Sequence, residues 1–276
     1  MEKKRESMEE MKKKIEKRME DIDHTVVVMS GKGGVGKSTF ATNLATKLAQ
    51  DGLEVGILDC DMHGPSVPKI TGISYERRPK GDEYSMEPIS TDYGLKVMSL
   101  GSLLPEKDSP VVWRGPLKMR TIQQFLGNVN WGDLDYLIFD LPPGTGDEPL
   151  SIAQLIPDPD GAVIITTPQD VALQTIRRSL KFAEKVDLPI LGLVENMSGF
   201  VCPNCGEEID IFTSGGGKSL SEELNLPFLG TIPLDPDIVK SGEEERPIVL
   251  DKDSKIAGLF GNIASEIRKS IEEDTS

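Results

Sequence analysis

The chain has 276 residues, and its 31 lysines and arginines are outnumbered by 46 aspartates and glutamates, giving a formal net charge of −15. Hydrophobic residues make up 37% and charged residues 28% of the sequence, which is typical of globular proteins and excludes a largely disordered chain. The negative charge predicts no nucleic-acid partner, because phosphate binding requires a basic face. The longest apolar run, Ala162–Thr167, is far shorter than the ~20 residues that cross a bilayer, so no membrane span is expected.

Residues 1–23 are predicted to form a charged lead-in helix. Hydrophobic residues recur there at spacings of three and four, as on one helix face: Met8, Met11, Ile15, Met19 and Ile22. This charged start lacks the apolar stretch of a secretory signal. The three cysteines of the chain are too few, and odd in number, for a disulfide framework. We therefore expect a cytoplasmic protein.

Residues 24–276 are predicted to form one domain, because no Gly/Ser-rich or Pro-rich linker interrupts them. Apolar runs of strand length alternate there with helical stretches, as in βαβ units. The predicted strands are Thr25–Met29, Val55–Leu58, Leu95–Leu100, Tyr136–Asp140, Ala162–Thr167, Ile190–Glu195 and Phe228–Ile232. The predicted helices are Lys37–Gln50, Pro116–Asn128, Val171–Val186, Gly217–Leu224 and Ile256–Ile271. This order predicts an α/β fold with a doubly wound, mainly parallel sheet flanked by helices, and ligands at the carboxyl ends of its strands.

The sequence after the first predicted strand matches the phosphate-loop pattern Gly-x4-Gly-Lys-Ser/Thr at Gly31, Gly36, Lys37 and Ser38. Glycines permit backbone angles that let successive N–H groups converge on phosphate oxygens, and the following helix directs its positive end at the same anion. Lys37 is expected to contact the β- and γ-phosphates of ATP, and the Ser38 hydroxyl to bind Mg²⁺. The predicted nucleotide-binding residues of this loop are Gly31, Lys32, Gly33, Gly34, Val35, Gly36, Lys37, Ser38 and Thr39.

Three carboxylates follow strands that are predicted to lie near this loop. Asp59 and Asp61 end the second strand, and Asp140 ends the run Tyr-Leu-Ile-Phe-Asp. An aspartate at such a strand end can hold Mg²⁺ directly or through water, and we expect this of Asp59 and Asp140. Asp61 is expected to orient the attacking water, although the sequence does not separate the roles of Asp59 and Asp61.

A second lysine inside the loop, Lys32, is not required by the general phosphate-loop pattern. With it, the loop resembles the deviant phosphate loop of the MinD/ParA/nitrogenase-iron-protein class. That resemblance implies that Lys32 reaches across a nucleotide-sandwich dimer to the phosphates of the partner subunit. A cation delivered in this way stabilises the charge on the transferring phosphoryl group, as an arginine finger does. The residues expected to act in catalysis are thus Lys32, Lys37 and Asp61.

Further motifs narrow this resemblance. The runs Asp59–Ser66, Trp113–Pro116, Asp140–Glu148, Glu195–Ser198 and Cys202–Gly206 together look like those of the Mrp/ApbC-type iron–sulfur cluster carrier ATPases. The resemblance covers nearly all of residues 24–270. It implies a homodimer that binds a [4Fe–4S] cluster, transfers it to apo-proteins and hydrolyses ATP. It also implies that Asn196 contacts the adenine.

The Cys-x-x-Cys motif formed by Cys202 and Cys205 is expected to lie in a loop after the sixth strand. This spacing recurs in zinc and iron–sulfur sites, which usually have four ligands. Two chains related by a two-fold axis would supply four thiolates. Spacing alone does not separate a cluster from zinc, and the resemblance favours the cluster. Cys60, between two aspartates, is interpreted as a buried filler.

Two other classes of protein share the phosphate loop. A MinD/ParA-like organising ATPase with a dimer-bridging zinc site is the main alternative. A membrane organiser would end in a basic amphipathic helix, whereas this chain ends in the acidic run Ile271–Ser276, and a DNA organiser would need a basic patch. A reductase resembling nitrogenase iron protein is disfavoured, because its two cluster ligands come from separate loops.

Overall fold

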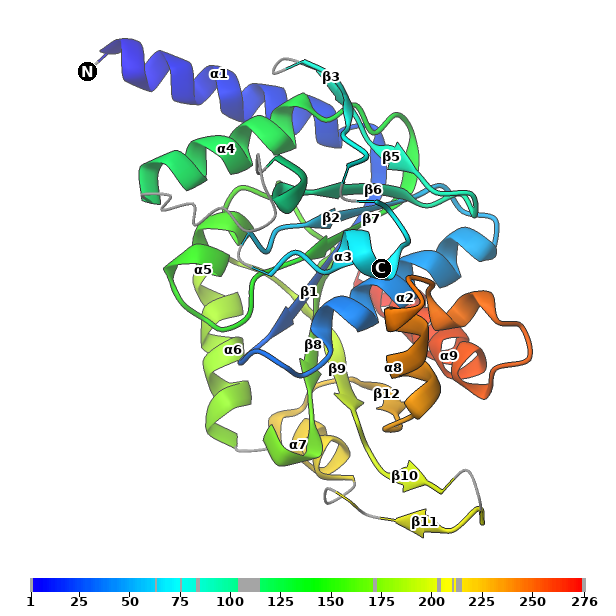
Figure 1. Cartoon of the computed structure of the whole chain (residues 1–276). Coiled ribbons are helices and arrows are strands. Elements are labelled where there is room, and N and C mark those ends of the chain that lie inside the picture. The colour runs from blue at the N-terminus through cyan, green and yellow to red at the C-terminus, as the bar shows by residue number, and fades with distance from the viewer. Residues whose placement is uncertain are drawn as a thin grey trace.

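An eight-stranded sheet runs through the protein (Figure 1). The computed structural model describes residues 2–62, 64–74, 76–82, 85–103, 115–170, 173–202, 205–209, 211 and 215–274. The strand order is β12 (Phe228–Ile232), β9 (Ile190–Asn196), β8 (Gly161–Thr166), β1 (Ile22–Ser30), β7 (Leu134–Asp140), β2 (Val55–Asp59), β6 (Lys96–Ser99) and β5 (Ile89–Ser90). All neighbours are parallel except β5, which pairs antiparallel with β6. This arrangement confirms the predicted α/β class with a mainly parallel sheet.

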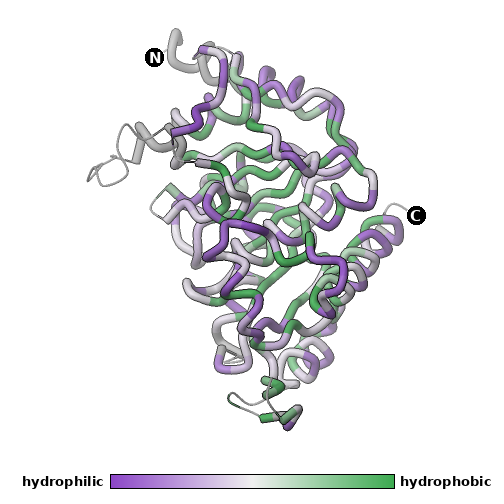
Figure 2. The backbone as a smooth tube through the Cα atoms, turned by 45° about the vertical axis from the view of Figure 1, so that its right-hand side comes forward, coloured by the Kyte–Doolittle hydropathy of each residue, from purple (hydrophilic) through white to green (hydrophobic). Residues whose placement is uncertain are grey.

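Helices cover both faces of the sheet, because successive side chains of a strand point to opposite sides. On β1, Val26 and Val28 belong to one buried cluster, and Val27 and Met29 to the other. The first cluster lies under α2 (Lys37–Gln50) and α9 (Lys255–Asp274). The second lies under α1 (Glu2–Met19), α4 (Gly115–Asn128), α5 (Asp147–Ala153), α6 (Leu173–Lys185) and α7 (Gly216–Leu224). Figure 2 shows the corresponding hydrophobic strands in the interior.

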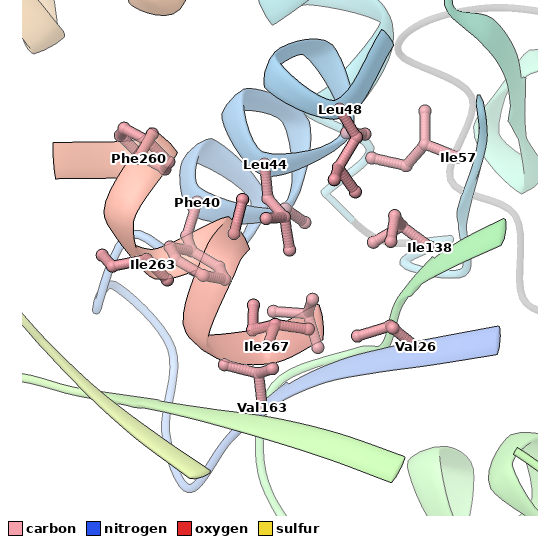
Figure 3. Packing of buried hydrophobic residues seen from close by; sticks show 14 of the residues in the cluster. Val26, Phe40, Leu44, Leu48, Ile57, Ile138, Val163, Phe260, Ile263 and Ile267 are labelled. Carbon is pink, nitrogen blue, oxygen red and sulfur yellow. The ribbon is translucent and has the colours of Figure 1, made fainter. Parts of the chain in front are cut away.

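The packing of α2 against α9 fixes the helix that follows the phosphate loop (Figure 3). The rings of Phe40 on α2 and Phe260 on α9 lie with their centroids 5.7 Å apart. Ile263 and Ile267 on α9 belong to the same cluster as Val163 on β8. Because all of these side chains are almost fully buried, the start of α2 is held in a fixed position relative to the sheet.

The N-terminal helix α1 packs along α4. Ile15 and Met19 are buried, as their spacing predicts, and Met11 packs partly against the same cluster; the side chain of Met8 lies outside the described residues. The Lys14 ammonium donates to Asn128 Oδ1 at 2.5 Å, which ties the two helices together. The sheet begins at Ile22, near the end of the predicted lead-in segment. Within the described ranges, no helix is both long and apolar enough to cross a membrane.

Most predicted elements are present with small changes at their ends, and α2 and β12 have the predicted bounds. The predicted strand at Leu95–Leu100 is shorter, because η1 (Leu100–Leu103) begins at its end. The predicted start of α6, Val171, lies outside the described residues. The elements not predicted are short. The helical ones are α3 (Val67–Ile70), α5, α8 (Pro236–Glu243), η1, η2 (Pro168–Asp170) and η3 (Ile248–Leu250). The strands are β5, the pair β3 (Lys80–Gly81) and β4 (Met86–Glu87), and the pair β10 (Phe200–Val201) and β11 (Glu208–Ile209).

Removal of the Phe260 side chain should destabilise the protein strongly. We expect Phe260→Ala to lower the free energy of unfolding by about 3–5 kcal/mol, because it leaves a cavity beside Phe40. Urea denaturation measures this change. The matched control is Val239→Ala on α8, where the side chain is 58% exposed and little change is expected. Equal effects of the two substitutions would contradict this account of the core.

Candidate functional site

The phosphate loop lies where the direction of chain winding in the sheet reverses. From β1 the chain passes through α2 to β2 on one side, and from β7 it returns to β8 on the other side of β1. The loop follows β1 at the carboxyl edge of this switch point, the usual ligand position in such sheets. Gly34 and Gly36 have φ of +80° and +81°, which side chains rarely adopt. A Cβ on Gly31 would lie 2.3 Å from Thr175 Cγ2, so a glycine there lets the loop pass close to α6.

A cavity of about 190 Å³ opens in front of this loop. Seven of the predicted nucleotide-binding residues line it: Lys32, Gly33, Gly34, Gly36, Lys37, Ser38 and Thr39. Gly31 and Val35 do not, and the Val35 side chain is buried in the core. Asp61 also lines the cavity, together with Ser30, Ser66 and Pro143, which the sequence patterns did not identify. Each of these three lies at or shortly after a strand end, which is the signal that points to this edge.

Lys37 forms a buried ion pair with Asp140 behind the cavity. Its ammonium Nζ lies 2.6 Å from Asp140 Oδ1 and 3.2 Å from Ser38 Oγ, and its side chain is only 6% exposed. The other carboxylate oxygen of Asp140, Oδ2, is buried without a hydrogen-bond partner among the described residues. Burial raises the pKa of Asp140, although the adjacent Lys37 acts in the opposite direction. This oxygen is a potential cation ligand, although Asp140, like Asp59, does not line the cavity.

Asp59 is completely buried and does not line the cavity. Its Oδ1 accepts from the Asp61 backbone N–H at 3.0 Å, and its Oδ2 accepts from Ser99 Oγ at 3.2 Å and from the Val67 backbone N–H at 3.4 Å. Burial, and then the charge of the neighbouring Asp140, raises the pKa of Asp59 to about 8. Asp59 thus fixes the segment that presents Asp61 to the cavity, and the two aspartates occupy different environments.

Asn196 lies at the end of β9, against the back of the phosphate loop. Its amide Nδ2 donates to the Val35 carbonyl at 2.8 Å. A Cβ on Gly36 would lie 2.3 Å from the same nitrogen, so only a glycine fits beside this amide. Lys32, in contrast, is exposed at the mouth of the cavity. Of the motif that begins at Trp113, the first two residues lie outside the described residues.

Cys202 and Cys205 lie in a loop after β9, as predicted, and this loop connects the two strands of a hairpin, β10–β11. The Cys202 backbone N–H donates to the Glu207 carbonyl and its carbonyl accepts from the Gly206 N–H, each at 2.9 Å. Cys202 is half-buried and Cys205 is exposed. The hairpin projects from the end of β9 (Figure 1). Cys60 is fully buried, as its position between two aspartates predicts, and burial raises the pKa of its thiol.

Comparisons with known proteins agree with this arrangement. Residues 21–268 match the ParA family model described as NUBPL iron-transfer P-loop NTPase. The chain is 47% identical over 259 residues to the iron–sulfur cluster carrier protein of Methanocaldococcus jannaschii, covering 94% of this chain and 89% of the relative. It is 44% identical over 259 residues to a cytosolic Fe–S cluster assembly factor of Saccharomyces cerevisiae, covering 90% of this chain and 88% of the relative.

Solved structures show the same fold. A nucleotide-binding protein from Archaeoglobus fulgidus, in complex with ADP, superposes with a TM-score of 0.79 at 39% identity and covers 90% of this chain and 96% of its own. The cell division ATPase MinD of Pyrococcus furiosus superposes with a TM-score of 0.67 at 23% identity and covers 90% and 99%. The likeness to MinD concerns the fold alone.

The raised pKa of Asp59 predicts a pH-dependent loss of stability. An unfolded aspartate releases its proton near pH 4, whereas folded Asp59 keeps it to about pH 8. Between these values the folded state holds the additional proton, so the free energy of unfolding falls as pH rises. The variant Asp59→Asn lacks this titrating group, so its stability should not fall with pH for this reason. We therefore expect the free energy of unfolding of Asp59→Asn, minus that of wild type, to be larger at pH 8 than at pH 5.

Urea denaturation of the metal-free and nucleotide-free protein at both pH values measures this difference. The control is Asp92→Asn, because Asp92 is exposed. Its stability relative to wild type should be the same at pH 5 and pH 8. A difference between Asp59→Asn and wild type that does not change with pH would show that Asp59 is ionised in the folded protein.

Proposed function

Because this chain belongs to the family of iron-transfer P-loop NTPases, we propose that it is an ATP-hydrolysing homodimer that carries an iron–sulfur cluster and delivers it to apo-proteins in the cytoplasm. The observation that carries this proposal is the pairing of a phosphate loop with a Cys-x-x-Cys hairpin that projects from the same sheet. The phosphate loop would bind ATP, and the hairpin would present two thiols to an external partner.

The cavity would bind a nucleoside triphosphate together with Mg²⁺. The backbone N–H groups of the loop and the Lys37 ammonium would bind the phosphates. The Ser38 hydroxyl and the unpaired oxygen of Asp140 are hard oxygen donors, which suit Mg²⁺. Asp59 would act on this ion through water or through its hold on Asp61, because both of its oxygens already accept hydrogen bonds within the protein, unlike Asp140 Oδ2. Asn196 does not line the cavity, and it would contact the adenine where the nucleotide extends past the phosphate loop.

Hydrolysis would require groups from two subunits. Asp61 lines the cavity and would orient the attacking water, while Lys37 holds the phosphates. Lys32 is exposed at the cavity mouth, a position from which a lysine can reach across a dimer interface. There it would stabilise the negative charge that develops on the transferring phosphoryl group of the partner's nucleotide.

The [4Fe–4S] cluster would bridge two hairpins. Cys202 and Cys205 supply two thiolates, and a second copy of the chain supplies the other two. Three large apolar side chains of the hairpin segment are exposed in the single chain: Val201 by 51%, Ile209 by 42% and Ile211 by 49%. Figure 2 shows hydrophobic stretches of chain on the protruding hairpin. Their burial against the same residues of a second copy would favour the dimer by the hydrophobic effect.

Loss of one thiol should abolish cluster binding. We expect Cys202→Ala, after anaerobic reconstitution, to lack the visible absorbance and the iron and sulfide content of the wild-type dimer. Cys60→Ala is the control, because Cys60 is buried away from the hairpin and should retain both. An unchanged iron and sulfide content in Cys202→Ala would exclude this ligand. Zinc without iron in the wild-type protein purified anaerobically would instead favour a zinc-bridged organising ATPase.

Loss of Lys32 should impair hydrolysis and leave nucleotide binding intact. We expect Lys32→Ala to lower the ATP hydrolysis rate by on the order of 10³, the effect of removing a cation supplied in trans. Calorimetry should show an almost unchanged Kd for ATP, whereas Lys37→Ala should lose most of the binding.

The matched control is Lys218→Ala. Lys218 is exposed and lies in a second Gly-Lys-Ser run, which lacks the first glycine of the phosphate-loop pattern. This variant should hydrolyse ATP at the wild-type rate. Wild-type turnover by Lys32→Ala would rule out the role of Lys32 in trans.

A further inference from the structure

The last two residues of β9 face opposite sides of the sheet, as adjacent residues of a strand do. On one side, the Asn196 amide donates to the Val35 carbonyl of the phosphate loop and packs against Gly36. On the other side, the Glu195 carboxylate is completely buried. One rigid dipeptide therefore contacts the nucleotide loop with one side chain and the opposite layer with the other.

Glu195 accepts three hydrogen bonds. They come from the Ser198 hydroxyl, from the Gly215 backbone N–H at 3.1 Å and from the Gly217 backbone N–H. A buried carboxylate is costly unless such donors compensate for the lost water. The carboxylate also lies at the N-terminus of α7, where the helix dipole favours a negative charge. A Cβ on Gly217 would lie 2.8 Å from Glu195 Oε2, so the glycine permits this close approach.

These three donors bracket the thiol hairpin along the chain. Ser198 lies on the segment that leaves β9 toward Cys202, and Gly215 lies on the segment that returns to α7. The described residues on either side of the hairpin, Ser198 before it and Gly215 at the start of α7, are called its stems here. Both are bonded to one carboxylate, one residue away from the side chain that contacts the phosphate loop. Backbone hydrogen bonds from Ser198 to the Ile232 carbonyl and from Leu234 to the Gly199 carbonyl, each 2.9 Å, anchor the leaving stem to the end of β12.

We infer that Glu195 is a positioning residue that couples the nucleotide loop to the thiol hairpin. A nucleotide in the cavity contacts the loop whose Val35 carbonyl is bound by Asn196. A change in that contact moves the end of β9, and Glu195 passes the change to both stems of the hairpin. Nucleotide state then sets the exposure of Cys202 and Cys205. This inference gives the proposed function a physical link between hydrolysis and cluster release, and it rests on that function for its biological meaning.

The reactivity of the two hairpin thiols tests the coupling on metal-free protein. Their reaction rate with an aromatic disulfide reagent is measured without nucleotide, with saturating Mg·ADP and with a non-hydrolysable ATP analogue. Cys60 is buried and reacts separately, if at all. The rates are compared at a protein concentration where size-exclusion chromatography gives the same oligomeric state in all conditions. In wild type, at least one nucleotide should change the rate by about five-fold or more, the usual size of an allosteric coupling.

Glu195→Gln keeps the shape of the side chain and removes its charge, so the hairpin stems lose their common anchor. The rate ratio with and without nucleotide should fall to less than about two-fold, while calorimetry confirms that the variant is saturated with nucleotide. Glu222→Gln on α7 is the matched control, because Glu222 is exposed and carries the same charge change. It should keep the wild-type ratio.

A wild-type ratio near one, or a full ratio in Glu195→Gln, would overturn the inference. If Glu195→Gln does not fold, the same rates are measured on Ser198→Ala. This variant removes one of the three hydrogen-bond donors, so its ratio of rates with and without nucleotide should lie between the wild-type ratio and one. An unchanged ratio in Ser198→Ala would then count against the coupling. Since the assay needs no iron, a failure of cluster binding is recognised separately, by iron and sulfide analysis of the reconstituted protein.

Discussion

The electrostatics of the site depend on one buried lysine and two buried aspartates, which lie at the ends of neighbouring parallel strands. The register of β1, β7 and β2 places Asp140 beside Val28 and Asp59 beside Asp140, so that both carboxylates lie directly behind the phosphate loop. Lys37 balances Asp140 at 2.6 Å. In the proposed ATP complex, a triphosphate bound by Lys37 would draw the ammonium away from Asp140, and the carboxylate would then require another cation. Mg²⁺ held by Ser38 and Asp140 would supply that charge.

Both proposed chemistries are incomplete within a single chain, for separate physical reasons. A four-ligand iron–sulfur centre needs two more thiolates than the hairpin provides. Charge on a transferring phosphoryl group needs a cation outside the loop that holds it, and Lys32 faces outward from that loop. The apolar side chains of the hairpin segment add a third reason, because their exposure is unfavourable in water. The proposed second copy of the chain would meet all three requirements at once.

Sequence patterns predicted the elements with long, regular periodicity and missed those fixed by tertiary contacts. The helix α2 has a full amphipathic pattern after a glycine, and its bounds matched. The hairpin has two residues in each strand, too few for an alternation to be recognised. Asp59 and Asp61 looked equivalent in sequence, yet the chain turns after β2, which buries Asp59 against Ser99 and leaves Asp61 at the cavity. Ser66 and Pro143 lie within two of the runs quoted from the sequence, but no pattern in those runs separates them from their neighbours as cavity residues.

The thiol hairpin occupies the place of an ordinary strand-to-helix connection between β9 and α7, two strands away from β1 in the sheet. A parallel sheet ends all of its strands at one edge, so an insertion at any of these connections lies on the same side as the phosphate loop. The fold supplies this proximity, but it does not relate the state of one loop to that of another. Coupling between the two loops requires a specific contact where the inserted hairpin joins the sheet. Here that contact is made by the buried carboxylate of Glu195. The next residue, Asn196, binds the phosphate loop.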